Sequence, residues 1–105
     1  MMSKDTELPT KPLKASADEV AELRRDAGAW LKSLREARGL SQRDLAQRVG
    51  VDYYTFISQV ESGRGRIPPE RYRAWAGALD MSPKDFVTKL MRYYDPVTYR
   101  ILFSN

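Results

Sequence analysis

The stretch LREARGLSQRDLAQRVGV, residues 34–51, contains the signals that begin and end one short helix. Ser41 is a favourable N-cap, and Asp44 three residues later completes a weaker form of the capping box. The helix is predicted over residues 42–48, and Gly50 ends it because glycine adopts a positive φ angle without steric cost. Its inward-facing residues are predicted to be Leu45, Ala46 and Val49.

A second short helix is predicted directly after the first, beginning at about Asp52 or Tyr53 and ending at Gly63. Ile57 and Val60 stand three residues apart, so both face inward and leave the opposite side of the helix free. Ala46, in the first helix, is small enough for the second helix to pack across it. Two short helices joined by a tight turn in this way are predicted to form a helix-turn-helix, which places its second helix in the DNA major groove.

Upstream of this motif, one long helix is predicted over residues 17–38. Ser16 and Glu19 form a capping-box pattern at its start, and Gly39 ends it. Gly28 lies inside the helix at a cost of about 1 kcal/mol relative to alanine. It therefore marks either a kink or a close contact with another helix. Apolar residues recur at every third or fourth position: Val20, Leu23, Ala27, Trp30, Leu31 and Leu34.

Downstream of the motif, an arginine-rich loop leads into further helices. A fourth helix is predicted over residues 69–79, because Pro69 suits the first helical position. Ser82 precedes a fifth helix that runs to about Tyr94. Residues 97–103 form either a sixth short helix or a strand, because Val, Thr, Tyr and Ile also favour strands. Trp30 and Trp75 are predicted to be core residues.

The predicted fold class is all-α, with one domain in the 105 residues. Residues 1–15 are polar, contain two prolines and are predicted to be a disordered tail. Residues 16–92 form the helix-turn-helix domain. Residues 93–105 form a C-terminal segment for packing or dimerisation.

Composition excludes several function classes. The chain contains no cysteine and no histidine, so it lacks disulfides, zinc fingers, thiol nucleophiles and imidazole acid–base chemistry. The acidic residues are scattered, and we expect neither a metal site, nor a cofactor, nor a small-molecule ligand, nor enzymatic activity. No apolar run of about 18 residues and no signal-peptide core are present. We therefore expect no membrane association and a cytoplasmic protein, associated with the nucleoid through DNA.

The charge favours an anionic partner. The net charge is +4, and residues 35–73 contain eight arginines against five acidic residues. The guanidinium group suits both phosphate oxygens and guanine edges because its donors form a planar fork.

Three motifs give the chain a resemblance to the Cro/cI-type helix-turn-helix proteins, also called the XRE family. They are LREARGLSQRDLAQRVGV (34–51), ISQVESG (57–63) and RYRAWAGALDMSPKDF (71–86). The resemblance covers about residues 29–90. It implies a five-helix lambda-repressor-like domain that binds double-stranded DNA through its third helix, usually as a homodimer on a palindromic site. This chain departs from the family by one extra residue between Val51 and Phe56. Either the turn is longer, or the third helix starts earlier with Asp52 as its cap.

The same resemblance implies roles for individual residues. The predicted base-contacting residues are Tyr54, Thr55, Ser58 and Gln59. The predicted phosphate-contacting residues are Gln42, Arg43, Arg64 and Arg66. Arg35 and Glu61 are expected to form a structural ion pair that fixes the recognition helix. Phe56 is predicted to lie in the core, whereas Tyr54 is equally compatible with the core and with the groove.

The C-terminal segment carries seven apolar or aromatic residues among residues 93–103. Such a surface is too apolar to stay exposed, so it packs on the N-terminal helix extension, forms a dimer interface, or does both. The dimerisation candidates are Tyr94, Val97, Tyr99, Ile101, Leu102 and Phe103.

Two functions fit these patterns. The first is a sequence-specific transcriptional regulator, more often a repressor, that binds an inverted repeat as a dimer. The alternative is an antitoxin-like protein-interaction module with secondary DNA binding, in which the main partner binds an end of the chain.

Overall fold

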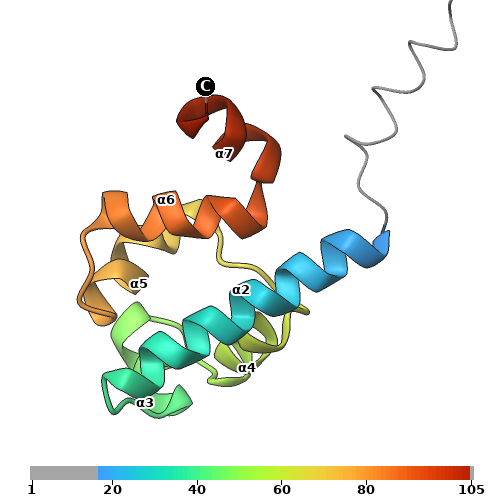
Figure 1. Cartoon of the computed structure of the whole chain (residues 1–105). Helices are drawn as coiled ribbons and strands as arrows, with labels where there is room; N and C mark the ends of the chain where they lie inside the picture. Colours follow the sequence, from blue (N-terminus) through green and yellow to red (C-terminus); the bar gives the residue numbers. More distant parts are fainter. Residues whose placement is uncertain (1–16, 105) are drawn as a thin grey trace, which may run out of the picture.

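The computed structural model describes residues 17–104, and this part of the chain is all-α. The predicted tail at residues 1–15 and the Ser16 cap lie outside the described residues. The helices are α2 (Ala17–Ala37), α3 (Gln42–Val49), α4 (Thr55–Ser62), α5 (Tyr72–Ala78), α6 (Pro83–Tyr94) and α7 (Pro96–Phe103), with one 3-10 turn, η1 (Pro69–Arg71), before α5 (Figure 1). No helix in residues 17–104 is long and apolar enough to cross a membrane.

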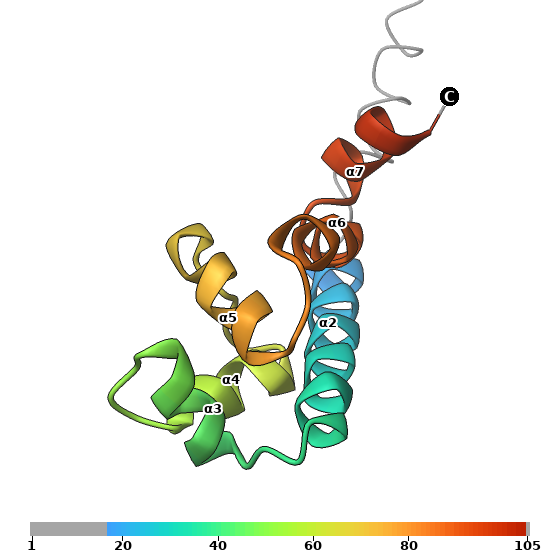
Figure 2. The same cartoon turned by 90° about the vertical axis from the view of Figure 1, so that its left-hand side faces the viewer.

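The core forms where α2 packs against α4 and α6, and where α5 packs against α3 and α6. The largest fully buried side chains are Leu31, Leu45, Ile57, Val60, Ile67, Trp75, Phe86 and Leu90. Trp75 is one of them, whereas Trp30 is half-buried and stacks on Phe86 with ring centroids 5.8 Å apart. The helix-turn-helix unit lies at one end of the molecule, and α7 lies at the other (Figures 1 and 2).

Helix α3 has the predicted caps at both ends. The Ser41 hydroxyl accepts a hydrogen bond from the backbone N–H of Asp44, and the Asp44 carboxylate accepts one from the backbone N–H of Ser41. Gly50 ends the helix at a φ angle of 77°. Because these signals act within a few residues, the sequence alone was sufficient to place this helix.

Helix α4 starts later than predicted. It begins at Thr55 with Tyr54 at the N-cap position, so Asp52 does not cap it. The extra residue therefore lengthens the turn. Arg71 contacts the start of this turn: its Nη1 atom donates to the carbonyl oxygens of Val49, at 2.9 Å, and Gly50, at 3.4 Å. These bonds connect the end of α3 to the last residue of η1.

Gly28 marks a close contact between helices, and α2 continues through it. A Cβ atom at this position would lie 2.1 Å from the carbonyl oxygen of Glu61 and 2.8 Å from that of Val60. The backbone of α4 therefore approaches α2 at a distance that only glycine permits.

The C-terminal residues 96–103 form a helix, and the Asp95 side chain caps it by accepting from the backbone N–H of Thr98. Helix α7 packs on α6. Tyr94, expected at a dimer interface, is instead buried in its own chain. Its hydroxyl accepts a hydrogen bond from the backbone N–H of Ile67 at 3.1 Å.

Candidate nucleic-acid interface

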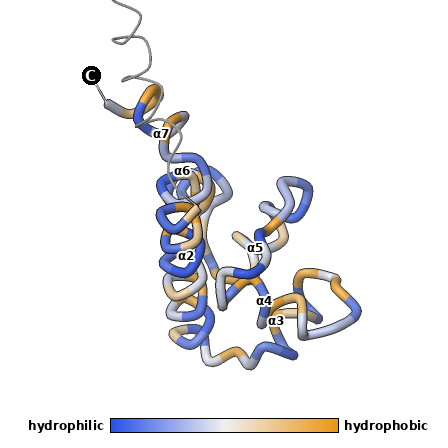
Figure 3. The backbone as a smooth tube through the Cα atoms, turned by 90° about the vertical axis from the view of Figure 1, so that its right-hand side faces the viewer, coloured by the Kyte–Doolittle hydropathy of each residue, from blue (hydrophilic) through white to orange (hydrophobic). Residues whose placement is uncertain are grey.

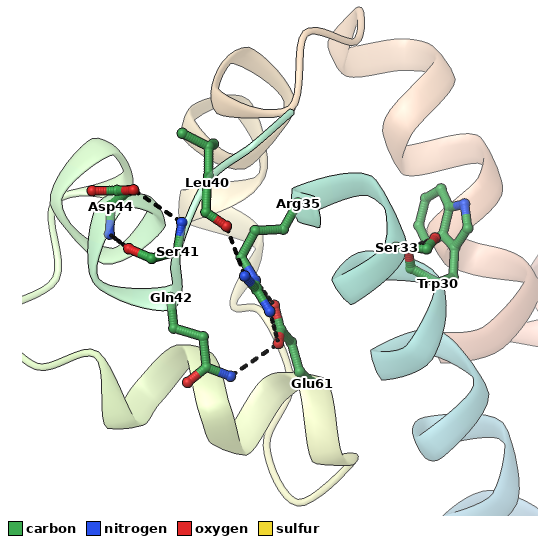
Figure 4. Close-up of polar contacts among 8 residues, drawn as sticks. All are labelled: Trp30, Ser33, Arg35, Leu40, Ser41, Gln42, Asp44 and Glu61. Atoms are coloured by element: carbon green, nitrogen blue, oxygen red, sulfur yellow. Dashed lines mark hydrogen bonds and ion pairs between the residues drawn. The ribbon is translucent and has the colours of Figure 1, made fainter. Parts of the chain in front are cut away.

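A buried ion pair connects α2 to α4. Nε of Arg35 lies 2.6 Å from Oε2 of Glu61, and Nη2 of Arg35 donates to Oε1 of Glu61 at 3.1 Å (Figure 4). The two side chains are 8% and 4% exposed. The hydrogen bond to Glu61 raises the pKa of Arg35 above its usual value. Nη1 of Arg35 also donates to the carbonyl oxygen of Leu40. The pair therefore fixes α4 and the loop before α3 to one guanidinium group.

Gln42 belongs to the same network. Its Nε2 atom donates to Oε1 of Glu61 at 3.0 Å (Figure 4). This side chain was expected to contact a phosphate, but its amide N–H₂ group is directed to Glu61 and joins the start of α3 to α4. The part of Gln42 best placed for an anion is its backbone N–H, because the first N–H groups of a helix have no partner within the helix.

The outer face of α4 carries the predicted base-contacting residues. Tyr54, Thr55 and Gln59 are exposed and Ser58 is half-buried, whereas Ile57 and Val60 face the core. Hydroxyl and amide groups on this face can pair with base edges, since an amide matches the donor and acceptor of adenine.

Arg43 and Tyr54 lie together at the start of this face. The Arg43 guanidinium lies 4.7 Å from the centroid of the Tyr54 ring, within the range of a cation–π interaction. The structure thus brings a predicted phosphate contact from α3 next to a predicted base contact. Tyr54 is 40% exposed, so it lies on the surface while its ring supports Arg43. Phe56 is half-buried against the core.

The longer turn borders a surface hollow of about 350 Å³. Tyr53, Thr55, Gln59 and Arg71 line this hollow, and Tyr53 is 75% exposed. Neither Tyr53 nor Arg71 is among the DNA-contacting residues predicted from the sequence. Arg71 carried no local signal, because its partners on α3 lie 21 and 22 residues away. Tyr53 lies in the segment that contains the extra residue, and this departure from the family pattern is the sequence signal that could have identified it.

Two other predicted phosphate-contacting residues, Arg64 and Arg66, lie in the loop after α4, away from Arg43. Arg64 and Arg66 are both exposed. The guanidinium of Arg66, however, lies 4.4 Å from the Tyr94 ring centroid, beside that of Arg24 at 5.9 Å. Burial raises the pKa of Tyr94. Arg66 therefore lies by the end of α6, apart from the Arg43 and Tyr54 pair.

These features define a class of protein: an all-α DNA-binding domain of the helix-turn-helix type. A family model described as a helix-turn-helix domain matches residues 26–88. The chain belongs to this helix-turn-helix family and is of the Cro/cI, or XRE, type.

Solved structures of similar proteins include two regulators. The restriction-modification controller protein C.AhdI from Aeromonas hydrophila is 35% identical, with a TM-score of 0.54, over 63% of this chain and 97% of that protein. The clp gene regulator ClgR from Corynebacterium glutamicum was matched in two structures, both with a TM-score of 0.56. One is 29% identical over 69% of this chain and 91% of that one, and the other is 26% identical over 78% and 86%. A comparison with curated protein sequences found no match.

Proposed function

We propose that this protein is a sequence-specific transcriptional regulator that binds double-stranded DNA as a homodimer on an inverted repeat. The observation that carries the proposal is the outer face of α4, where Thr55 and Gln59 are exposed and Ser58 is half-buried, with Arg43 packed on Tyr54 at the start of the helix. The similar proteins C.AhdI and ClgR are described as a controller protein and a gene regulator, which supports the same class of function. Bound across a promoter, the dimer represses by occlusion.

The mechanism separates positioning from sequence recognition. The N-terminus of α3, with Arg43, binds phosphates and sets the register of α4 on the duplex. Arg64 adds a phosphate contact from beyond the C-terminal end of α4. Gln59 then recognises adenine through its amide, and the hydroxyls of Thr55 and Ser58 bond to neighbouring base edges. The Arg35–Glu61 pair keeps α4 at a fixed angle during this contact.

A homodimer is required for specificity, because one short helix reaches too few base pairs to select a single site. We place the dimer interface on α7, whose residues Val97, Ile101, Leu102 and Phe103 are exposed. Tyr99 is half-buried and lies against Phe103, with ring centroids 4.9 Å apart, so we include it in this interface through Phe103.

Selection from a library of random duplexes tests the proposal. The full chain should recover an inverted repeat whose half-sites lie one helical turn of about 34 Å, or a multiple of it, apart. A chain with Thr55→Ala and Gln59→Ala should recover no comparable motif. The matched control Lys84→Ala, an exposed position on α6, should recover the wild-type motif. Recovery of no motif by the wild-type chain would refute the proposal.

Repression is tested by placing the recovered site over a promoter in a transcription reaction. Transcripts should fall as the protein is added, and they should not fall with the double variant. A rise in transcripts would leave DNA recognition intact but refute occlusion.

A further inference from the structure

A groove of about 570 Å³ lies between the first half of α2 and the junction of α6 with α7. Its apolar lining includes Val20 and Leu23 from α2 and Tyr93 and Val97 from the other side. The family model spans residues 26–88, so these four residues all lie outside the matched domain. The segment before the matched domain and the segment after it therefore meet at one groove.

Helix α7 borders the groove and leaves most of its own apolar surface outside it. Ile101, Leu102 and Phe103 are 73%, 65% and 52% exposed and are not part of the groove lining. They belong to the last turn of α7, and this helix lies at the end of the molecule remote from α3 and α4 (Figure 3). Because they are consecutive in the helix, they point in different directions around its axis and leave the end of α7 apolar on several sides, which favours a protein contact.

The charges of the two surfaces are complementary. The α2 side of the groove carries more acidic than basic residues, and the side formed by α6 and α7 carries more basic than acidic ones. They are Glu19, Glu22 and Asp26 with Arg24 on the first side, and Arg92 and Arg100 with Asp95 on the second. A second α7 that entered the groove would bring its arginine to the carboxylates of α2. Opposite charges arranged in this way fix register and orientation at an interface.

We propose that the partner of this groove is helix α7 of a second copy of the chain, docked reciprocally about a two-fold axis. A helix of eight residues is about 12 Å long and about 10 Å wide, so one face of α7 covers far less than the roughly 800 Å² per partner of a stable interface. A dimer through α7 therefore needs the groove walls as well. Two-fold symmetry uses both grooves and both helices at once. This inference deepens the dimer of the proposed function and specifies how it is built.

Charge reversal in mixtures distinguishes docking between chains from packing within one chain. Arg100→Glu should weaken the dimer about tenfold or more, and Glu22→Lys with Asp26→Lys should do the same, because each places like charges across both contacts. An equimolar mixture of the two variants should restore dimerisation to within about threefold of the wild type, because in the mixed dimer one contact is native and the other pairs the two reversed charges. Analytical ultracentrifugation without DNA measures each dissociation constant. The matched control Lys84→Glu, outside the groove, should dimerise normally.

Crosslinking gives an independent measurement that does not depend on charge. Since the chain contains no cysteine, Val20→Cys and Ile101→Cys each introduce a single thiol. Mixing the two variants under oxidation should give a covalent dimer with one thiol from each chain. A control mixture of Tyr53→Cys with Val20→Cys should not, because Tyr53 lies at the turn before α4.

A wild-type monomer at high micromolar concentration would overturn the inference. So would a charge-reversed mixture that stays as weak as its components, or a mixture of Val20→Cys with Ile101→Cys that gives no covalent dimer between the two variants. All these experiments omit DNA. If the dimer behaves as stated and no DNA motif is recovered, the proposed function fails and the groove assignment stands.

Discussion

The buried pair of Arg35 and Glu61 should contribute far more to stability than the exposed pair of Arg38 and Asp80. Removing one partner leaves the other charge buried and unpaired, so Arg35→Ala should reduce the free energy of unfolding by about 3–5 kcal/mol. Arg38 and Asp80 are 3.3 Å apart on the surface, where water screens the attraction, and Arg38→Ala should cost less than about 1 kcal/mol. Urea unfolding of both variants checks the difference. Equal losses would mean that the first pair is not desolvated in solution.

Gln59 and Arg64 should affect DNA binding in different ways. Gln59→Ala removes an amide from the recognition face, so preference at one base pair in each half-site should fall by about 1–3 kcal/mol. Arg64→Ala removes a phosphate contact, so affinity should fall for every sequence and the salt dependence should flatten. Competition binding at several salt concentrations separates the two effects. Loss of selectivity in the Arg64 variant would contradict this assignment.

At the scale of elements, the contact between α2 and α4 depends on Gly28. An added Cβ would overlap the carbonyl oxygen of Glu61, which is backbone and cannot rotate away, so Gly28→Ala should destabilise the fold by at least about 3 kcal/mol. Gly77 in α5 is a matched control, because a Cβ there meets no atom within 4 Å. Gly77→Ala should stabilise the protein by about 0.5–1 kcal/mol through helix propensity. Thermal unfolding of the two variants should move in opposite directions.

The elements also show why sequence analysis succeeded for some features and failed for others. The helix caps at Ser41 and Ser82 act over three residues, so local patterns were sufficient to predict them. The hydrogen bonds from Arg71 to the end of α3 and from Ile67 to Tyr94, by contrast, join residues that are 21 to 27 positions apart. No local pattern contains this information. For Gly28 the sequence left two alternatives, and only the packing of α4 decided between them.

The cap of α3 should make stability depend on pH. Hydrogen bonds from the backbone N–H and the hydroxyl of Ser41 lower the pKa of Asp44. Since the folded pKa lies below the unfolded value of about 4, this stabilisation is complete above that value and is lost as the pH falls through the folded pKa. The wild type should therefore be more stable than Asp44→Asn at pH 7, and the difference should shrink as the pH falls below about 4 and vanish below the folded pKa. Urea midpoints measured across this range provide the check. Parallel curves would show that the charge of Asp44 does not contribute.

At the scale of the whole molecule, α7 should be separable from the DNA-binding domain at one specific residue. Tyr94 is buried and bonds to the backbone of Ile67, whereas the helix after Asp95 packs on α6 and exposes its apolar residues. A chain that ends at Asp95 should fold with nearly wild-type monomer stability. A chain that ends at Tyr93 should lose about 3–5 kcal/mol, because a buried aromatic side chain and its hydrogen bond are removed.

The chain that ends at Asp95 should also separate DNA recognition from dimerisation. It should bind a single half-site as well as the full chain does, because the face of α4 is intact. It should lose the additional affinity for the inverted repeat, because that gain arises from linking two recognition helices. Unfolding must be measured at low protein concentration, since dimer formation stabilises the full chain by mass action. Full affinity for the inverted repeat in the shortened chain would show that the dimer forms elsewhere, and that α7 serves another partner.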